Sequence, residues 1–464
     1  MIKDHINLVI KNYSNLNFLE SMVDSIQNNY QKETDVLQLL NFFDALCIIG
    51  EFNISIKILD RILEISPDWY DIYDLQARSY WAIHQYESAQ DKWKIYSQKK
   101  EKIYEKYNLE KNIYTVGEEW VHAFGNLAML YPILIEGYND TNDNFYYKNK
   151  YSKEENFNIS NYGKHVSNQF LFEIMPNIQH EIPLKIQKII DQDQLFLKLP
   201  FYASKDLKGN FTHWWVSFAE RMQAVKEKKQ FCNINSLNLD IQLIESKLKK
   251  FDFDLNKSFV ILHIRESSYW SEKDDLSHSS KNANIKNYIS SIKYLTSQGI
   301  QVIRIGNKGM KKIEKIKGFF DYANSEVKDE LIDLVLISKA EFFICNNSGP
   351  FVVAQIFSKP LVGTNWWTMH NPPFFNYDSV LYKKILNVKT NKYLNMDQAL
   401  NLDFGEYSFY NLLKKNLKLV ENDPDQILYS VKNMLKNYNN NFLEQKGTLN
   451  KYKKIAFSKA KIYY

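Results

Sequence analysis

The spacing of hydrophobic positions changes once along the chain. Up to about residue 111, apolar residues recur every three to four positions, as in amphipathic helices, and residues 1–32 read as a helical lead-in. From Tyr114 onward, short apolar runs alternate with helical segments, which is typical of a parallel sheet with crossover helices. The pattern predicts an α/β protein preceded by an α-helical region. The clearest strand-like runs are 258–265, 300–305, 340–345 and 359–365.

A repeat with a period of 34 residues lies within the helical region. Its period and residue pattern resemble tetratricopeptide repeats, in which paired helices bury their apolar faces on each other. Only about two units are visible, fewer than such repeats need for stability alone, so we expect them to pack on flanking helices or on the next domain. A generic helical cap is the alternative. The matching positions are Leu46 and Tyr80, Gly50 and His84, Phe52 and Tyr86, Ser55 and Ala89, and Leu59 and Trp93.

Four segments follow from these patterns. Residues 1–111 form the helical, tetratricopeptide-like region, and 112–250 and 251–400 form two Rossmann-like blocks that face a cleft. Residues 401–464 form C-terminal helices and a basic tail. In open α/β sheets the ligand binds outside the carboxyl ends of the strands, so we look for chemistry there.

Composition narrows the class of protein. The 464 residues are 45% hydrophobic and 24% charged, the balance of a folded globular protein. The net charge of +5 is small for this length, and we expect no nucleic-acid partner. Cys47, Cys232 and Cys345 lie far apart, which excludes a disulfide framework and a cysteine-based zinc site and suits a reducing cytoplasm.

No segment of the sequence reads as a membrane anchor. Residues 1–10 have charges within their short apolar stretch, unlike a signal peptide. The longest apolar stretch, near 127–135, is about half a membrane span. We expect a cytoplasmic protein without a transmembrane segment, soluble or peripheral at the inner membrane face.

Two strand ends of the second block offer phosphate contacts. Arg265 follows the first strand, where its guanidinium could grip a phosphate; the alternative is a salt bridge with Glu266 or another acid. His263 is as readily an interior histidine as a ligand contact. Ser348 and Gly349 join a later strand to a helix start, where free backbone N–H groups favour an anion. There the alternative is an ordinary connection with Ser348 as the helix cap.

Weaker candidates surround these two strand ends. After the next strand, Gly306 permits a tight turn, and Arg304 or Asn307 could reach a phosphate or a sugar; the alternative for Arg304 is a surface position. Asp321 and the helix carboxylates Asp329 and Asp333 could bind sugar hydroxyls or hold Arg265, or could be solvated or structural.

The first block offers a base. His122, with Glu118 and Glu119 as alternatives, could deprotonate an acceptor hydroxyl across the cleft, next to Gly125 and Asn126. A buried histidine and two solvated acids are the other interpretation. The sequence has no Walker motif, no dinucleotide fingerprint and no nucleophile elbow. D-x-D pairs occur at 191–193, 252–254 and 423–425, which is too frequent to indicate a metal site, and we expect no metal and no cofactor.

Residues 258–435 resemble a family of bacterial glycosyltransferases encoded with surface-polysaccharide genes, and the His263-x-Arg265 strand end resembles that of GT-B fucosyltransferases. The resemblance implies a GT-B fold with the nucleotide-sugar donor on the second block, and it implies that Arg265, Ser348 and Gly349 lie near the donor diphosphate. Family members usually have a Gly-His pair where this chain has Gly125-Asn126. The matching segments are 262–267, 282–288, 299–306, 320–323, 333–334, 341–344, 348–349, 357–360, Asn365 and 420–427.

We therefore expect a metal-independent glycosyltransferase that moves a sugar from a nucleotide sugar to a glycan in surface-polysaccharide biosynthesis. Closure of the two blocks would exclude water. One alternative is a protein acceptor held by the helical repeats, which would make a protein the partner. Another is a non-catalytic scaffold that binds nucleotide sugars, which the departure at Asn126 favours. The expected catalytic residues are His122, Glu119 and Arg265; Gly125 and Asn126 contact the acceptor; the donor contacts are His263, Arg265, Arg304, Gly306, Asn307, Asp321, Asn347, Ser348, Gly349 and Asn365.

Overall fold

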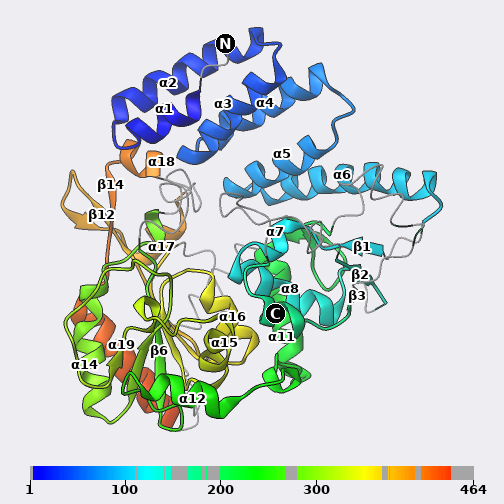
Figure 1. Cartoon of the computed structure of the whole chain (residues 1–464). Helices are drawn as coiled ribbons and strands as arrows, with labels where there is room; N and C mark the ends of the chain where they lie inside the picture. The colour runs from blue at the N-terminus through cyan, green and yellow to red at the C-terminus, as the bar shows by residue number, and fades with distance from the viewer. Residues whose placement is uncertain are drawn as a thin grey trace.

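A computed structural model describes residues 4–109, 113–139, 142–147, 166–179, 184, 186, 199–266, 279–367, 375, 377–402 and 409–439 (Figure 1). It has an N-terminal helical region, a first α/β unit and a second α/β unit built on a parallel sheet, so the predicted α/β class with a helical lead-in is confirmed. The described short 3-10 helices are η1 (Tyr30–Lys32), η2 (Ile234–Ser236), η3 (Ser279–Lys281), η4 (Ile285–Tyr288) and η5 (Tyr322–Asn324).

The helical region contains two helix hairpins that share features at the predicted spacing. The turn of each hairpin has a residue with positive φ at the same repeat position, Gly50 (83°) and His84 (62°). Leu59 and Trp93 are both fully buried. Membership of the tetratricopeptide class stays a prediction. The helices are α1 (His5–Asn12), α2 (Leu16–Asn29), α3 (Val36–Ile49), α4 (Phe52–Ile65), α5 (Asp71–Ala82) and α6 (Tyr86–Lys106).

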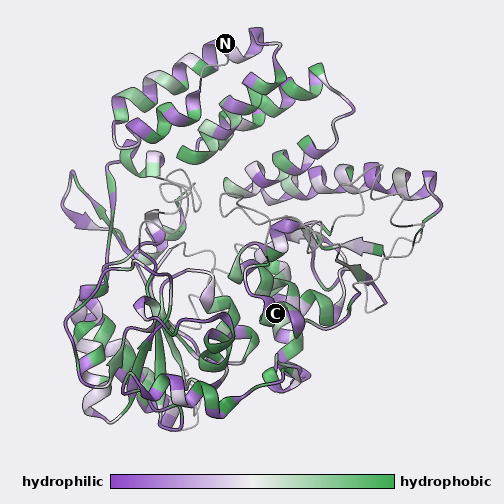
Figure 2. Ribbon diagram, in the orientation of Figure 1, coloured by the Kyte–Doolittle hydropathy of each residue, from purple (hydrophilic) through white to green (hydrophobic). Residues whose placement is uncertain are grey.

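The second α/β unit contains a six-stranded parallel sheet in the order β11-β10-β9-β6-β7-β8. Numbered along the chain, this is the 3-2-1-4-5-6 order of the Rossmann fold. The central strands are almost wholly apolar because helices cover both faces (Figure 2). The strands are β6 (Phe259–His263), β7 (Gln301–Arg304), β8 (Phe319–Phe320), β9 (Phe343–Cys345), β10 (Leu361–Trp366) and β11 (Ser379–Tyr382).

Alternate residues of β6 serve the two faces of this sheet. Val260 and Leu262 lie in a core cluster with α14 (Ile289–Ser297) and α19 (Pro424–Asn439). Phe259 and Ile261 lie in a second cluster, with α15 (Glu330–Lys339), α16 (Pro350–Ile356) and α12 (Ile241–Lys249).

The first α/β unit is smaller in its described part. Three parallel strands, β1 (Ile113–Thr115), β2 (Asn144–Tyr146) and β3 (Ile178–Gln179), form its sheet. The second core cluster continues into this unit, where the Trp215 ring lies 5.8 Å from that of Phe351. The short apolar run 195–199, whose pattern predicts a strand, lies outside the described residues except for Leu199. The other elements are α7 (Glu118–Val121), α8 (Phe124–Glu136), α9 (Gln169–Glu173), α11 (Trp214–Glu227), and the antiparallel pair β4 (Ala203–Lys205) and β5 (Phe211–His213).

The C-terminal segment differs from the predicted all-helical one. Leu417–Val420 forms β14, which pairs with β12 (Lys384–Asn387) and β13 (Lys392–Tyr393) in an antiparallel sheet, because its alternating apolar and polar residues suit a half-buried strand. The helix α19 packs in the core of the second unit through Ile427 and Val431, so it completes that unit. The other helices are α17 (Met396–Leu400) and α18 (Phe409–Lys414), and the predicted basic tail at 440–464 lies outside the described residues.

The helical region contacts both α/β units. Phe409 of α18 stacks on Tyr13, with ring centroids 4.5 Å apart, and Tyr410 is buried in the core of α1–α4. On the other side, Trp81 of α5 stacks on His213, with centroids 5.1 Å apart. Within the described ranges, no helix has both the length and the apolar character to cross a membrane.

Candidate functional site

A cavity of about 360 Å³ lies between the two α/β units, at the carboxyl ends of β6, β7 and β9. This is where a doubly wound sheet binds its ligand. From the first unit, the cavity is lined by the start of α8 and by Ser167 and Asn168. From the second unit, it is lined by His263, Arg265, Glu266, Lys281, Ile305, Gly306, Asn307, Met310, Lys328, Glu330, Asp333, Asn347, Ser348, Gly349 and Pro350.

The starts of two helices meet at this cavity. A Cβ atom built on Gly125, in the first turn of α8, would lie 2.5 Å from the Cα of Gly349, which caps α16. The two backbones can approach so closely because neither residue has a side chain. The N-terminal ends of both helices, with their partial positive charge, therefore face the same space.

His263 and Ser348 form a hydrogen-bonded pair in this cavity. Nε2 of His263 lies 3.1 Å from the Ser348 hydroxyl, and Nδ1 lies 3.2 Å from the Ile305 carbonyl. Burial lowers the pKa of His263 to about 4, and the nearby Arg304, Arg265 and Lys328 act in the same direction. The ring is therefore neutral at pH 7. Because the Ile305 carbonyl can only accept, we assign the proton to Nδ1, and Nε2 accepts from Ser348.

Asn346 fixes the backbone around Arg265. Its side-chain oxygen accepts from the Arg265 backbone N–H at 2.9 Å, and its amide group donates to the Lys281 carbonyl at 2.7 Å. The Arg265 guanidinium contacts the Asn282 side chain, and the residue is only 5% exposed. Arg265 and Lys281 thereby bring two positive charges to the cavity wall. No role was predicted for Asn346 from the sequence.

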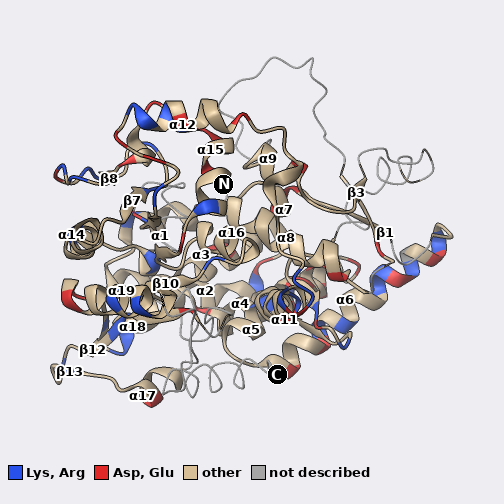
Figure 3. Ribbon diagram, turned by 90° about the horizontal axis from the view of Figure 1, so that it is seen from below, with Lys and Arg blue, Asp and Glu red and all other residues tan. Residues whose placement is uncertain are grey.

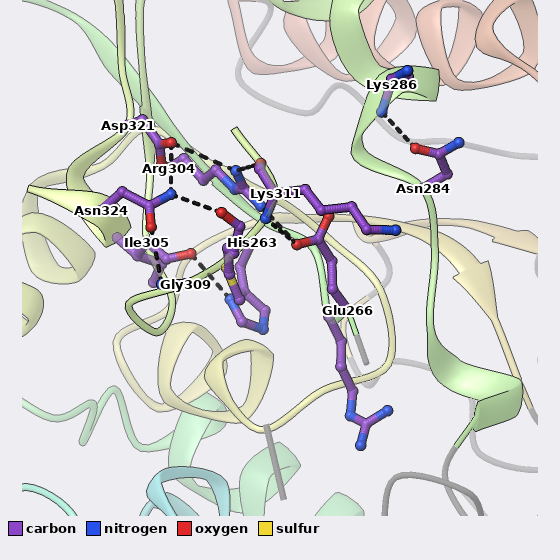
Figure 4. Close-up of polar contacts among 12 residues, drawn as sticks. His263, Glu266, Asn284, Lys286, Arg304, Ile305, Gly309, Lys311, Asp321 and Asn324 are labelled. Atoms are coloured by element: carbon purple, nitrogen blue, oxygen red, sulfur yellow. Dashed lines mark hydrogen bonds and ion pairs between the residues drawn. The ribbon is translucent and has the colours of Figure 1, made fainter. Parts of the chain in front are cut away.

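Arg304, by contrast, is engaged in a polar network with Asp321 and Lys311 (Figure 4). Its fully buried guanidinium donates to the Lys311 carbonyl at 2.6 Å and pairs with Glu266 at 3.3 Å and Asp321 at 3.7 Å. Neither Arg304 nor Asp321 lines the cavity. The network instead holds the turn that places Gly306 and Asn307 at the cavity, so we do not retain Arg304 and Asp321 as donor contacts.

Three further predicted site residues lie away from the cavity lining. Asn365 is fully buried and donates to the Tyr288 hydroxyl at 3.0 Å, which is a structural contact. The ring of His122 contacts the Glu118 carbonyl at 2.8 Å, and the Glu119 carbonyl accepts from Asn126 at 2.8 Å. Neither His122 nor Glu119 lines the cavity, whereas Gly125 and Asn126 do.

Among the described residues that line the cavity, those with titratable side chains all belong to the second unit. Asp333 lies 3.1 Å from the Lys328 ammonium through Oδ2, and its carboxylate also interacts with the Tyr322 hydroxyl. Burial raises the pKa of Asp333, and Lys328 opposes the shift. Asp329, the other predicted helix carboxylate, caps α15 through the backbone N–H of Leu331 at 2.9 Å.

Contacts between α9 and α15 close one side of the cavity. Asn168 donates to the Glu330 carbonyl at 3.0 Å, and the Glu330 carboxylate accepts from the Gln169 backbone at 2.9 Å. No sequence pattern indicates these contacts, because the partners lie about 160 positions apart. Among the described residues, no group of three or more His, Cys, Asp or Glu residues is placed to hold a metal ion.

Comparisons with known proteins give two similarities. No family model matches the chain. The chain is 24% identical over 492 residues to Protein Ycf2 of Physcomitrium patens, which covers 97% of this chain but spans only a fifth of that relative's length. A solved structure of a family 9 glycosyl transferase from Veillonella parvula is similar over 71% of this chain and 99% of its own, with a TM-score of 0.36 and 9% identity. Neither similarity assigns a family, so the chemistry is argued from the site itself.

The cavity is suited to an anion with hydroxyl groups. Arg265, Lys281 and the two helix starts supply positive charge and donors, while Glu266, Glu330 and Asp333 supply the carboxylates of the lining. A phosphate group would satisfy the donors, and sugar hydroxyls would satisfy the carboxylates. A nucleotide sugar contains both.

Proposed function

We propose that the chain is a glycosyltransferase that uses a nucleotide-sugar donor bound mainly by the second α/β unit. The observation that supports this proposal most directly is that Arg265 and the turn of Ser348 and Gly349 line one cavity between two α/β units. Fixed donors at a departing diphosphate stabilise the charge that develops on it, which is the main catalytic need of sugar transfer from such donors.

We further propose that Asp333 accepts the proton of the acceptor hydroxyl, in place of His122. Asp333 lines the cavity and has a raised pKa, which moves a carboxyl toward the range of a useful base. His263 is less suitable, because both of its ring nitrogens are engaged by Ile305 and Ser348.

In its finer form, the proposal is that the acceptor is a glycan of the cell surface and that the protein acts in the cytoplasm without a metal. The resemblance of residues 258–435 to transferases encoded with surface-polysaccharide genes supports this form. Gly125 and Asn126, which line the cavity from the first unit, would then lie on the acceptor side.

Arg265→Ala tests the donor site. The wild-type protein is first screened for thermal stabilisation by nucleoside diphosphates and nucleotide sugars, since a ligand at about 100 times its Kd stabilises by about 2.7 kcal/mol. We expect Arg265→Ala to lose this stabilisation and to lower sugar transfer by about 100- to 1000-fold. Arg61→Ala, on α4, is the matched control. A folded Arg265→Ala variant with unchanged transfer would contradict the proposal.

Asp333→Asn separates the base from the donor site. Because the amide keeps the shape but cannot accept the proton, we expect transfer to fall by about 100-fold or more while stabilisation by the nucleotide persists. Loss of nucleotide binding in this variant would instead place Asp333 in the donor site. Transfer at the wild-type rate would exclude Asp333 as the base.

A further inference from the structure

Two segments that meet in the antiparallel sheet are rich in lysine. Residues 379–396 and 409–420 contain seven lysines and no acidic residue. The net charge of the whole chain is only +5, so the rest of the chain is slightly acidic. We call β12, β13, β14, the turn 388–391 and α18 the basic sheet. The lysines are Lys383, Lys384, Lys389, Lys392, Lys414, Lys415 and Lys418.

Most of these lysines face solvent. Lys383 is buried and donates to the Asn282 carbonyl at 2.7 Å, so it supports the structure. Lys384 and Lys414 lie 3.9 Å from Asp423 and 4.0 Å from Glu51, which are long, weak ion pairs. The exposed lysines are Lys389, Lys392, Lys414, Lys415 and Lys418.

Apolar side chains are exposed at the tip of the same sheet. Val388, in the turn beside Lys389, is 53% exposed, and Tyr393, next to Lys392 on β13, is 54% exposed. The hairpin of β12 and β13 projects from the side of the molecule (Figure 1), and β12, β13 and α18 lie at one edge in the view from below (Figure 3). Exposed apolar tips beside lysines suit the boundary between lipid headgroups and acyl chains, where tyrosine is enriched.

We propose that the basic sheet docks on the surface of a lipid bilayer that contains anionic lipids. The lysines pair with lipid phosphates, and Val388 and Tyr393 enter the headgroup region and leave water. A soluble polyanion would satisfy the lysines but would leave Val388 in water, so the bilayer fits the whole surface better. This proposal does not depend on the proposed function.

A second lysine-rich segment provides a matched control. Residues 308–317 contain five lysines and one glutamate, but their isoleucines, Ile313 and Ile316, pack against the core of the second unit. Lys312 and Lys315 are exposed. This segment is also rich in lysine, and it lacks the exposed apolar tip of the basic sheet.

Flotation of the full chain with lipid vesicles tests the proposal. We expect the wild-type protein to float with vesicles of equal parts phosphatidylcholine and phosphatidylglycerol and to stay behind with phosphatidylcholine alone. Lys389→Glu with Lys392→Glu should lower the partition coefficient at least about tenfold. Val388→Ser with Tyr393→Ser should lower it several-fold, whereas Lys312→Glu with Lys315→Glu should leave it unchanged. Thermal unfolding establishes that each variant is folded.

Three results would overturn the proposal. The first is absence of the wild-type protein from the floated vesicles. The second is an equal loss of binding in the variant at Lys312 and Lys315, because the effect would then be one of total charge. The third is tighter binding to heparin than to vesicles together with no effect of the changes at Val388 and Tyr393, which would make the surface a polyanion site.

Discussion

At the residue scale, the pleat of a strand decides which side chains reach the cavity. Leu262 pairs with Arg304 in the parallel register, and paired residues share a face of the sheet. Leu262 packs with α14 and α19, so Arg304 points to that side and away from the cavity. His263 pairs with Cys345 and takes the opposite face. Successive residues of a strand face opposite sides of the sheet, so a residue at the cavity and a residue in the structural core can be neighbours in sequence.

The buried His263 makes stability depend on pH. Its pKa is about 4 in the folded protein and about 6.5 in the unfolded chain, so the unfolded state takes up the proton first as the pH falls. The contribution of neutral His263 to the free energy of unfolding is intact above pH 6.5 and is lost as the pH falls from 6.5 to about 4. From pH 7 to pH 5 we expect this group alone to lower the free energy of unfolding by about 2 kcal/mol.

Chemical denaturation of the wild-type protein and of His263→Asn at the two pH values checks this expectation. Asparagine can still donate to the Ile305 carbonyl but does not titrate. Between pH 7 and pH 5, the free energy of unfolding of the variant should therefore fall by about 2 kcal/mol less than that of the wild-type protein. Equal losses of unfolding free energy in the two proteins would contradict a buried, neutral His263 ring.

At the element scale, the contact between α8 and α16 joins the two units. The absence of side chains at Gly125 and Gly349 allows this contact, and the apolar core that includes Trp215 and Phe351 surrounds it. A large apolar interface restricts relative motion of two units, so the cavity is preformed and the expected closure of the blocks is not needed to build it.

Gly125→Ala tests this contact through the sign of the change in the free energy of unfolding. Within an ordinary helix, glycine to alanine stabilises by about 0.5–1 kcal/mol. Here the new methyl group would collide with the backbone at Gly349, so we expect a loss of about 1–3 kcal/mol in the free energy of unfolding. Urea denaturation measures it, and a more stable variant would show that the backbones are farther apart.

The sequence predicted the gathering of Arg265, Ser348, Gly306 and Asn307, because the carboxyl ends of parallel strands meet at one edge of a sheet. It did not predict that Arg304 pairs with Glu266 and Asp321, because the pleat of the strand and a distant turn decide which side chains meet there. It left Asp333 open between a site residue and a solvated or structural carboxylate, because a helix carboxylate facing a cavity has the same sequence pattern as a solvated one.

At the scale of the whole molecule, the helical region is attached at both ends. The second unit contacts α1–α4 through α18, where Asn411 also donates to the Gly50 carbonyl at 3.1 Å. The helix α5 contacts α4, with Gln76 donating to Asp60 at 2.6 Å, and contacts the first unit through Trp81 and His213.

Tyr410→Ala tests whether α18 anchors the helical region. Truncation of this buried ring should lower the free energy of unfolding by about 3–5 kcal/mol. In hydrogen exchange, we expect the amides of α2 and α3 to exchange faster while those of β6 and β9 are unchanged. The control is Tyr429→Ala, at an exposed position on α19. Faster exchange throughout the chain would show that α18 is not a local anchor.

The attachment at both ends closes the molecule into a ring. From the second unit, contacts run through α18, the helical stack and the first unit, and return through α8 and α16 to their starting point. In a closed ring of contacts, one part cannot rotate against its neighbour by itself, because the other contacts must accommodate the rotation. Substrate exchange should therefore rely on small movements at the mouth of the cavity and not on a hinge.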